Sequence, residues 1–266
     1  MMVNRQIDAV AELQNAFQAL LKNWVLAIPT GVAALVASAF LVFVVLATVG
    51  SLVGAGMMGA TGGQQTPNPS ALLALAGAGG VTFIVGGVVI FILYLLACAA
   101  VMAAAEDVWR GQPADLAKGI SKAFGRLGPL LVLFFISIVV GIVCGLLILA
   151  LGLGIILAIV LSFFWMYALP AIVISNQGAM QALGTSYRLA RQNLAPSLIA
   201  FLGIIVVTFV GQIVLGLFKH VPALEIILAF AIGGFTYAFS ALVAVRFYDL
   251  LSAPVAPATP VARTTP

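Results

Sequence analysis

The sequence feature that most constrains the fold is a long segment without charge. Residues 129–175 contain no Asp, Glu, Lys, Arg or His. About 20 apolar residues cross the hydrocarbon core of a membrane as an α-helix, so this segment is too long for one crossing. Glycine tolerates tight turns, and the sequence LGLGI at residues 151–155 predicts a hairpin there. The segment therefore predicts two membrane-spanning helices joined by a short turn.

The composition of the whole chain also indicates a membrane protein. The chain is 64% hydrophobic and 7% charged, whereas an average globular chain carries about 25% charged residues. The apolar runs lack the alternation of polar and apolar residues that the strands of a membrane barrel need. We therefore expect an all-α polytopic membrane protein, with six transmembrane helices arranged as three hairpins in a single domain over residues 1–252. The spans are expected at about residues 25–52, 81–104, 129–149, 154–175, 197–218 and 224–245.

The basic residues divide unequally between the two sides that six spans would create. Cytoplasmic loops of membrane proteins carry an excess of Lys and Arg. Only Lys219 lies on the side that also holds the uncharged loop 54–70. We therefore expect both termini in the cytoplasm, with a disordered tail over the Pro-rich residues 253–266. The basic residues on the side of the termini are Arg5, Lys22, Arg110, Lys118, Lys122, Arg126, Arg188, Arg191, Arg246 and Arg263.

A polar segment at residues 178–194 separates two apolar runs. At helical spacing, its apolar and polar residues fall on different faces, which predicts an amphipathic helix too polar to span a membrane. Just before it, Pro170 lies within the predicted fourth span and is expected to kink that helix. The polar face contains Gln181, Thr185, Arg188 and Gln192.

Residues 111–127 have the same construction as residues 178–194. A shift of 67 residues places Gly111 on Gly178 and Pro129 on Pro196. A third, weaker copy is found at the N-terminus, around residues 7–22. The pattern predicts a cytoplasmic amphipathic helix before each hairpin. Two explanations stay open: a true internal repeat, as in many membrane folds, or the basic linkers that any such protein needs on its inner face.

The polar segment also carries a family resemblance. The sequence resembles six-span prokaryotic membrane proteins, namely the membrane domain attached to some glycerophosphoryl diester phosphodiesterases and the stand-alone YciC-like proteins. In this sequence Asn176 stands near the position where the family often has an acid. The resemblance implies the six-span fold and location in the cytoplasmic (inner) membrane of a prokaryote. The matching residues are Pro170, Ile172, Val173, Ile174, Gly178, Ala182, Ser186, Arg191 and Asn193, with VRFYDLL at residues 245–251.

Side chains that could carry catalysis are sparse. The one histidine, His220, lies in a short loop of the expected outer side. Glu106 and Asp107 are adjacent at the end of the second span, where a nearby arginine can balance them. Cys98 and Cys144 lie in apolar runs and are expected to pack as small apolar residues. No set of residues has the spacing of a metal site. The sequence therefore predicts no cofactor, no metal and no enzymatic activity.

Two functions agree with these features. The first is a non-enzymatic integral membrane protein, either a scaffold, an accessory subunit or a lipid-interacting component, whose partners are membrane lipids, including anionic ones, and not nucleic acid; oligomerisation is left open. The candidate headgroup contacts are Lys118, Lys122, Arg126, Arg188 and Arg191. The alternative is a passive transporter or channel with a pathway between the hairpins. Its candidate lining residues, which could equally bond between helices, are Gln212, Thr236 and Ser240.

Overall fold

The computed structural model describes residues 7–40, 43, 69–218 and 221–253. These residues form helices and no strand, which confirms the all-α fold class. Five helices are long and apolar enough to cross a membrane. A sixth candidate is formed by two helices, Ala9–Lys22 and Trp24–Phe40, that are bent by 88° relative to each other. The protein is therefore a polytopic membrane protein with five or six candidate spans.

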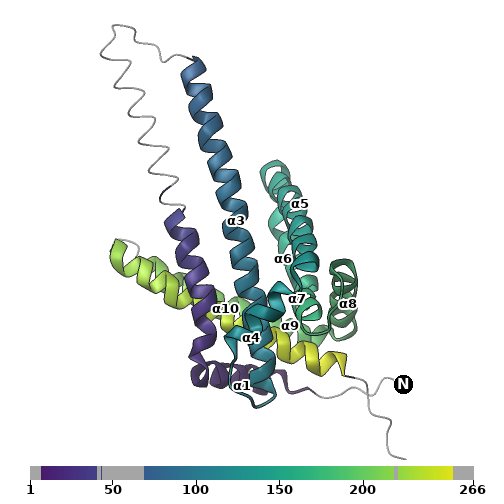
Figure 1. The fold of residues 1–266 in the computed structure, drawn as a ribbon. Coiled ribbons are helices and arrows are strands. Elements are labelled where there is room, and N and C mark those ends of the chain that lie inside the picture. Colours follow the sequence, from purple (N-terminus) through teal and green to yellow (C-terminus); the bar gives the residue numbers. More distant parts are fainter. Residues whose placement is uncertain (1–6, 41–42, 44–68, 219–220, 254–266) are drawn as a thin grey trace, which may run out of the picture.

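The helices follow one another with short connections, and Figure 1 shows their arrangement. The 3₁₀ turn η1 (Trp24–Leu26) begins the second helix of the bent pair. In Figure 1, α3 and the hairpin of α5 and α6 rise from the end of the molecule where α1 and α4 lie. The α-helices are α1 (Ala9–Lys22), α3 (Pro69–Trp109), α4 (Leu116–Phe124), α5 (Leu127–Leu151), α6 (Gly154–Trp165), α7 (Ala168–Val173), α8 (Ala179–Gln192), α9 (Leu194–Leu217) and α10 (Pro222–Ser252).

Local sequence signals set several helix ends. The carboxylate of Asp8 accepts a hydrogen bond of 3.0 Å from the backbone N–H of Ala11 at the start of α1. Asp115 caps α4 in the same way. Such caps satisfy backbone donors that have no partner within the helix. Gly152 ends α5 with a φ of 66°, a left-handed conformation that glycine adopts without strain. The turn between α5 and α6 thus falls where the sequence predicts it.

The predicted fourth span is divided into two helices. The break at Met166 and Tyr167 separates α6 from α7, and Pro170 lies inside α7. A proline ring clashes with the carbonyl of the residue four positions earlier, which here is Met166, and it lacks an N–H to bond to it. The helix is therefore interrupted one turn before Pro170, the residue at which the sequence predicts a kink.

Two helices extend beyond the predicted spans. α3 begins at Pro69, inside the loop predicted at residues 54–70, and runs to Trp109 instead of ending near residue 104. α10 continues to Ser252, past the predicted end at residue 245. The extension of α3 carries Glu106 and Asp107 and that of α10 carries Arg246, and all three are ion-paired within the protein, so the helices need not stop where the apolar run stops. The remainder of the loop and the tail from residue 254 onward lie outside the described residues.

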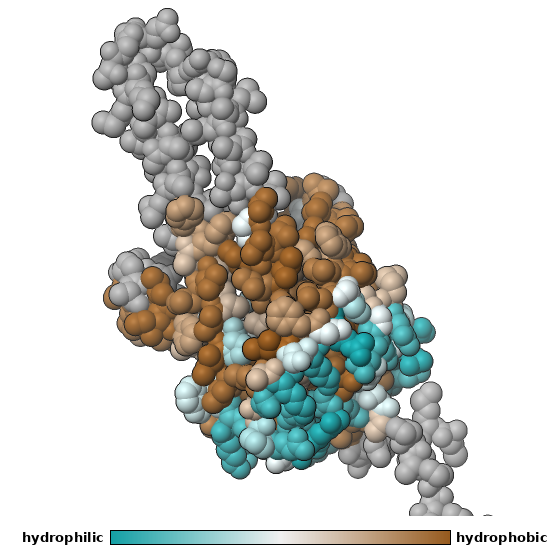
Figure 2. Space-filling view, in the orientation of Figure 1, coloured by the Kyte–Doolittle hydropathy of each residue, from teal (hydrophilic) through white to brown (hydrophobic). Residues whose placement is uncertain are grey.

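The buried residues gather at one end of the molecule, which we call the polar end. This end comprises α1, α4, α7 and α8 together with residues 98–109 of α3, 127–134 of α5, 194–200 of α9 and 238–252 of α10. Its core includes Tyr167, Phe247 and residues 99–105, most of them fully buried. Figure 2 shows hydrophilic residues over this end and hydrophobic residues over the rest of the visible surface.

Three short helices of the polar end, α1, α4 and α8, each dock on a neighbouring span. The ring of Phe17 in α1 packs edge-on against Phe235 of α10, with centroids 5.9 Å apart. In α4, a Cβ added at Gly119 would lie 2.5 Å from the carbonyl oxygen of Ala100 in α3. In α8, Ser186 hydrogen-bonds to the break between α6 and α7. Thus α4 and α8 each pack on the helix that precedes them, and α1 packs on the last helix.

Candidate functional site

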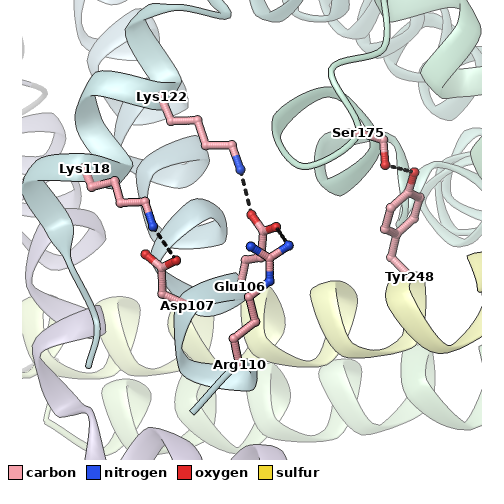
Figure 3. A network of polar contacts seen from close by, with 7 residues as sticks. All are labelled: Glu106, Asp107, Arg110, Lys118, Lys122, Ser175 and Tyr248. Atoms are coloured by element: carbon pink, nitrogen blue, oxygen red, sulfur yellow. Dashed lines mark hydrogen bonds and ion pairs between the residues drawn. The ribbon is translucent and has the colours of Figure 1, made fainter. Parts of the chain in front are cut away.

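The polar end joins α3 and α4 through a cluster of ion pairs, shown in Figure 3. Lys118 of α4 lies 2.7 Å from a carboxylate oxygen of Asp107, and Lys122 lies 2.6 Å from one of Glu106. Arg110 also pairs with Glu106. Both carboxylate side chains are 6% exposed, and burying them without cationic partners would be costly. The cluster therefore holds α4 on α3 and neutralises two of the lysines predicted to contact lipid.

A second ion pair connects the first and last helices. The guanidinium of Arg246 in α10 donates two hydrogen bonds, of 2.8 and 3.1 Å, to the carboxylate of Glu12 in α1. The same guanidinium lies 4.9 Å from the ring centroid of Trp109. The indole N–H of Trp109 donates to the carbonyl of Leu242 at 2.9 Å. Three helices that are distant in sequence are thereby fixed together by one arginine and one tryptophan.

A third set of contacts repairs the break before Pro170. The hydroxyl of Ser186 accepts from the backbone N–H of Tyr167 at 3.0 Å and donates to the carbonyl of Phe164 at 2.6 Å. The phenol of Tyr167, which is fully buried, donates to Ser197 of α9 at 3.0 Å. Backbone groups freed at a proline break in a membrane helix need such partners. Ser186, a residue of the family-like pattern, thus has a structural role.

A polar pocket of about 520 Å³ lies between α8, the end of α10 and the segment that links α7 to α8. Arg188 is its only charged lining residue, and two apolar side chains, Leu189 and Leu251, complete the wall. The hydroxyls of Ser175 and Tyr248 share a hydrogen bond of 2.7 Å across it, as Figure 3 shows. The other lining residues are Gln177, Thr185, Gln192 and Ser252.

The structure separates the five predicted headgroup contacts into two groups. Lys118 and Lys122 are held by the carboxylates of α3. Arg188 and Arg191 are exposed on α8, and neither forms an ion pair with any carboxylate that the structure describes. Arg126 is partly buried just before α5. Within the described residues, the cations available to a ligand are therefore mainly those of α8.

The three predicted pathway residues do not converge on a common site. Gln212 is exposed on α9. The hydroxyl of Thr236 donates to the carbonyl of Ile232 at 2.8 Å, and that of Ser240 donates to the carbonyl of Thr236 at 2.7 Å. Both hydroxyls are thus bonded within α10 itself. Next to Gln212, Gly211 lies close to Ile232 and Thr236 of α10, where a Cβ would meet both side chains.

Sequence reasoning missed most of the pocket. Ser175 and Tyr248 are 73 positions apart, and no motif links them. The polar face of α8 did indicate Thr185, Arg188 and Gln192, which line the pocket from one side. Among the described residues, no group of three or more His, Cys, Asp or Glu is placed to hold a metal ion. His220 lies outside the described residues.

Comparison with known proteins covers the region that contains this site. Residues 116–254, from α4 to the end of α10, match the profile of a family described as Domain of unknown function (DUF7847). Among curated proteins and solved structures, no significant match to the chain is found. Because the matched region covers more than half of the chain, this polytopic membrane protein belongs to the DUF7847 family.

Proposed function

We propose that the protein is a non-enzymatic component of the membrane whose polar end binds anionic lipid. The observation that carries this proposal is the contrast between α4 and α8. The lysines of α4 are neutralised by Glu106 and Asp107, whereas Arg188 and Arg191 of α8 are exposed and unpaired within the described residues. Unpaired guanidinium groups beside a membrane attract phosphate, which they bind through well-matched paired hydrogen bonds.

The ion pairs of the polar end indicate which basic residues should contribute to the binding of anionic lipid. A basic residue near an anionic membrane surface contributes about 1 kcal/mol. A lysine that already has a buried carboxylate partner gains less, because lipid binding would have to compete with that partner. Arg126, Arg188 and Arg191 together should therefore favour anionic lipid by about 3 kcal/mol, and the two lysines should add little.

Lipid retention tests this proposal. Three variants would be compared with the wild type by native mass spectrometry from mixed anionic and zwitterionic lipid. The first replaces Arg126, Arg188 and Arg191 by Gln, and the second replaces them by Lys. The third replaces Lys118 and Lys122 by Gln together with Glu106 by Gln and Asp107 by Asn, so that no buried carboxylate loses its cationic partner. Only the first should lose most of the bound anionic lipid. Equal retention in the first variant and the wild type would leave these arginines without a role in lipid binding.

We also propose that the polar end faces the cytoplasm, in the inner membrane of a prokaryote. The unequal distribution of basic residues supports this orientation. Single cysteines at positions 64 and 121, in a background without Cys98 and Cys144, would be treated in intact cells with a reagent that cannot cross the membrane. The cysteine at 64 should react and the one at 121 should not. The reverse labelling would invert the orientation.

The absence of enzymatic activity is part of the same proposal. The resemblance to phosphodiesterase-linked membrane domains makes glycerophosphodiesters the substrates to test. Purified protein should not hydrolyse them, with or without divalent metal ions. Hydrolysis that is lost in His220→Ala would overturn this part. The alternative of a passive pathway has less support, because Thr236 and Ser240 bond within their own helix.

We further propose that the chain is built from three related units. In α1, α4 and α8, a small residue and the residue four positions later are buried. The pairs are Ala16 with Leu20, Gly119 with Ala123, and Ser186 with Ala190. The shift of 67 residues that aligns the two polar segments also aligns the last two pairs, and it aligns the starts of α5 and α9 at Leu127 and Leu194.

Circular permutation tests the repeat. Because α1 docks on α10, a ring of three units would close upon itself. A chain that begins at residue 111 and joins residue 252 to residue 7 by a flexible linker should insert and purify as a folded protein. A permutant cut inside the third unit, between α8 and α9, serves as the control that should fail. Failure of both, or success of both, would argue against units with these boundaries.

A further inference from the structure

The pocket between α8 and α10 has a composition suited to one kind of ligand. Its lining contains one guanidinium, that of Arg188, and no carboxylate. Four hydroxyls and two amides complete its polar wall, so donors surround the positive charge on several sides. A phosphate group presents only acceptor oxygens and a negative charge, which is the complement of this lining. The hydroxyl groups belong to Ser175, Thr185, Tyr248 and Ser252, and the amides to Gln177 and Gln192.

Rigid elements hold the pocket. Tyr248 is 2% exposed and Leu189 is 6% exposed, so one residue of α10 and one of α8 anchor the pocket in the packed core. The hydrogen bond between Ser175 and Tyr248 fixes the orientation of the phenol. A phenol that is already in place loses little conformational entropy when a ligand binds.

One polar lining atom lacks a hydrogen-bond donor. The side-chain oxygen of Gln177 is buried and has no hydrogen-bond partner among the described residues. A buried acceptor without a donor costs about 1–3 kcal/mol. A ligand that carries a hydroxyl or ammonium group next to its phosphate would supply the donor. The volume of about 520 Å³ is also within the range of small-molecule sites, about 300–1,000 Å³.

From these observations we propose that the pocket is a phosphate-binding site in which Arg188 pairs with the anion. Tyr248 donates to one of its oxygens and accepts the O–H of Ser175 in the bond that joins the two hydroxyls, and Gln177 accepts from an adjacent hydroxyl or ammonium. The phosphate can come from a lipid headgroup or from a free phosphate in solution. This inference rests on the proposed lipid-binding function, because it assigns one of the exposed arginines to a defined site. It also separates Arg188 from Arg191, which lies on the same helix and does not line the pocket.

Full-length protein in nanodiscs tests the site. Binding would be measured to phosphatidylglycerol at increasing fractions in phosphatidylcholine, and separately to inorganic phosphate added to pure phosphatidylcholine discs. Arg188→Gln should weaken binding about tenfold, which corresponds to about 1.4 kcal/mol. Tyr248→Phe should weaken it by about fivefold, the loss of one hydrogen bond. The matched control, Arg191→Gln, should weaken lipid binding by no more than about fivefold, the contribution of a diffuse surface charge, and should change the binding of inorganic phosphate by less than about twofold.

The outcomes distinguish a lipid headgroup from free phosphate, and they distinguish failure of the pocket site from failure of the proposed lipid-binding function. Arg188-dependent binding in the first arm identifies a lipid headgroup, and in the second arm a free phosphate; either supports the site. Equal losses in Arg188→Gln and Arg191→Gln would overturn the site and leave only diffuse attraction to anionic lipid. Unchanged binding in Arg188→Gln and Tyr248→Phe would also overturn it. Retention of lipid by the triple arginine variant would instead overturn the proposed function itself. Thermal unfolding of each variant checks that it is folded.

Discussion

The two ends of α5 lie in different environments. Leu130, near its start, is fully buried, while Leu149, near its other end, is 86% exposed. The same division holds in α9, where Ala200 is buried and Leu217 is 71% exposed. At the polar end, helices pack on one another. Away from it, apolar side chains cover the outside, where lipid would surround them. The specific fold is therefore set mainly at the polar end, because contact with lipid does not distinguish one helix arrangement from another.

The hydrogen bonds of the two regions differ in the same way. In the polar end they join distant segments, as between Arg246 and Glu12 or between Trp109 and Leu242. In the apolar region, hydroxyls bond to the carbonyl four residues earlier in their own helix. These hydroxyls belong to Ser38, Ser137 and Thr236. These hydroxyls of the spans thus form their hydrogen bonds within one helix, whereas the hydrogen bonds between helices lie in the polar end.

The sharpest test of this division uses two leucines of one helix. Leu130→Ala should lower the free energy of unfolding by about 2–5 kcal/mol, because it leaves a cavity in a packed core. Leu149→Ala should change it by about 0.5 kcal/mol or less, as for other exposed positions. Both values can be measured by denaturant titration of the protein in mixed micelles. Similar losses in the two variants would mean that the exposed region is packed against something else.

Two glycines provide the next comparison. A Cβ at Gly119 would meet the backbone of Ala100, whereas one at Gly184 would meet nothing within 4 Å. Gly119→Ala should destabilise the protein by about 1–3 kcal/mol, because α4 must move away from α3. Gly184→Ala should stabilise α8 by up to about 1 kcal/mol, since alanine favours the helix. Thermal unfolding in detergent gives both signs, and a loss in Gly184→Ala would contradict the packing of α8.

Five of the six expected spans, and the helices α1, α4 and α8, could be predicted from the sequence because charge and hydropathy decide them locally; most of residues 41–52 of the first expected span lie outside the described residues. The turn at Gly152 followed from glycine chemistry in the same way. The partners of Lys118 and Lys122 could not be predicted with equal certainty, because they depend on how α4 docks on α3. Glu106 and Asp107 are close in sequence to the two lysines, but only the fold selects them as partners. The pocket is lined by residues from three elements, and no local sequence pattern predicts that these elements come together.

Ser186 and Ser240 extend the comparison to hydrogen bonds. Ser186→Ala should cost about 1–2 kcal/mol, because it leaves the backbone N–H of Tyr167 and the carbonyl of Phe164 without their partner. Ser240→Ala should be nearly neutral, since the carbonyl of Thr236 that it releases already belongs to the helix ladder. Unfolding free energies of the two variants provide the measurement. A large effect at Ser240 would indicate an interhelical role that its geometry does not show.

The smallest expected effect concerns the ion pair between Glu12 and Arg246, which joins the first helix, α1, to the last, α10. The two side chains are 17% and 31% exposed, so solvent screens part of their attraction. A double-mutant cycle with Glu12→Gln and Arg246→Met should give a coupling energy of about 0.5–1 kcal/mol. The coupling should fall as salt is raised, because screening shortens the range of the interaction, while the effect of Leu130→Ala should not. A coupling that is absent at low salt would show that α1 is held on α10 by Phe17 and its aromatic contacts and not by charge.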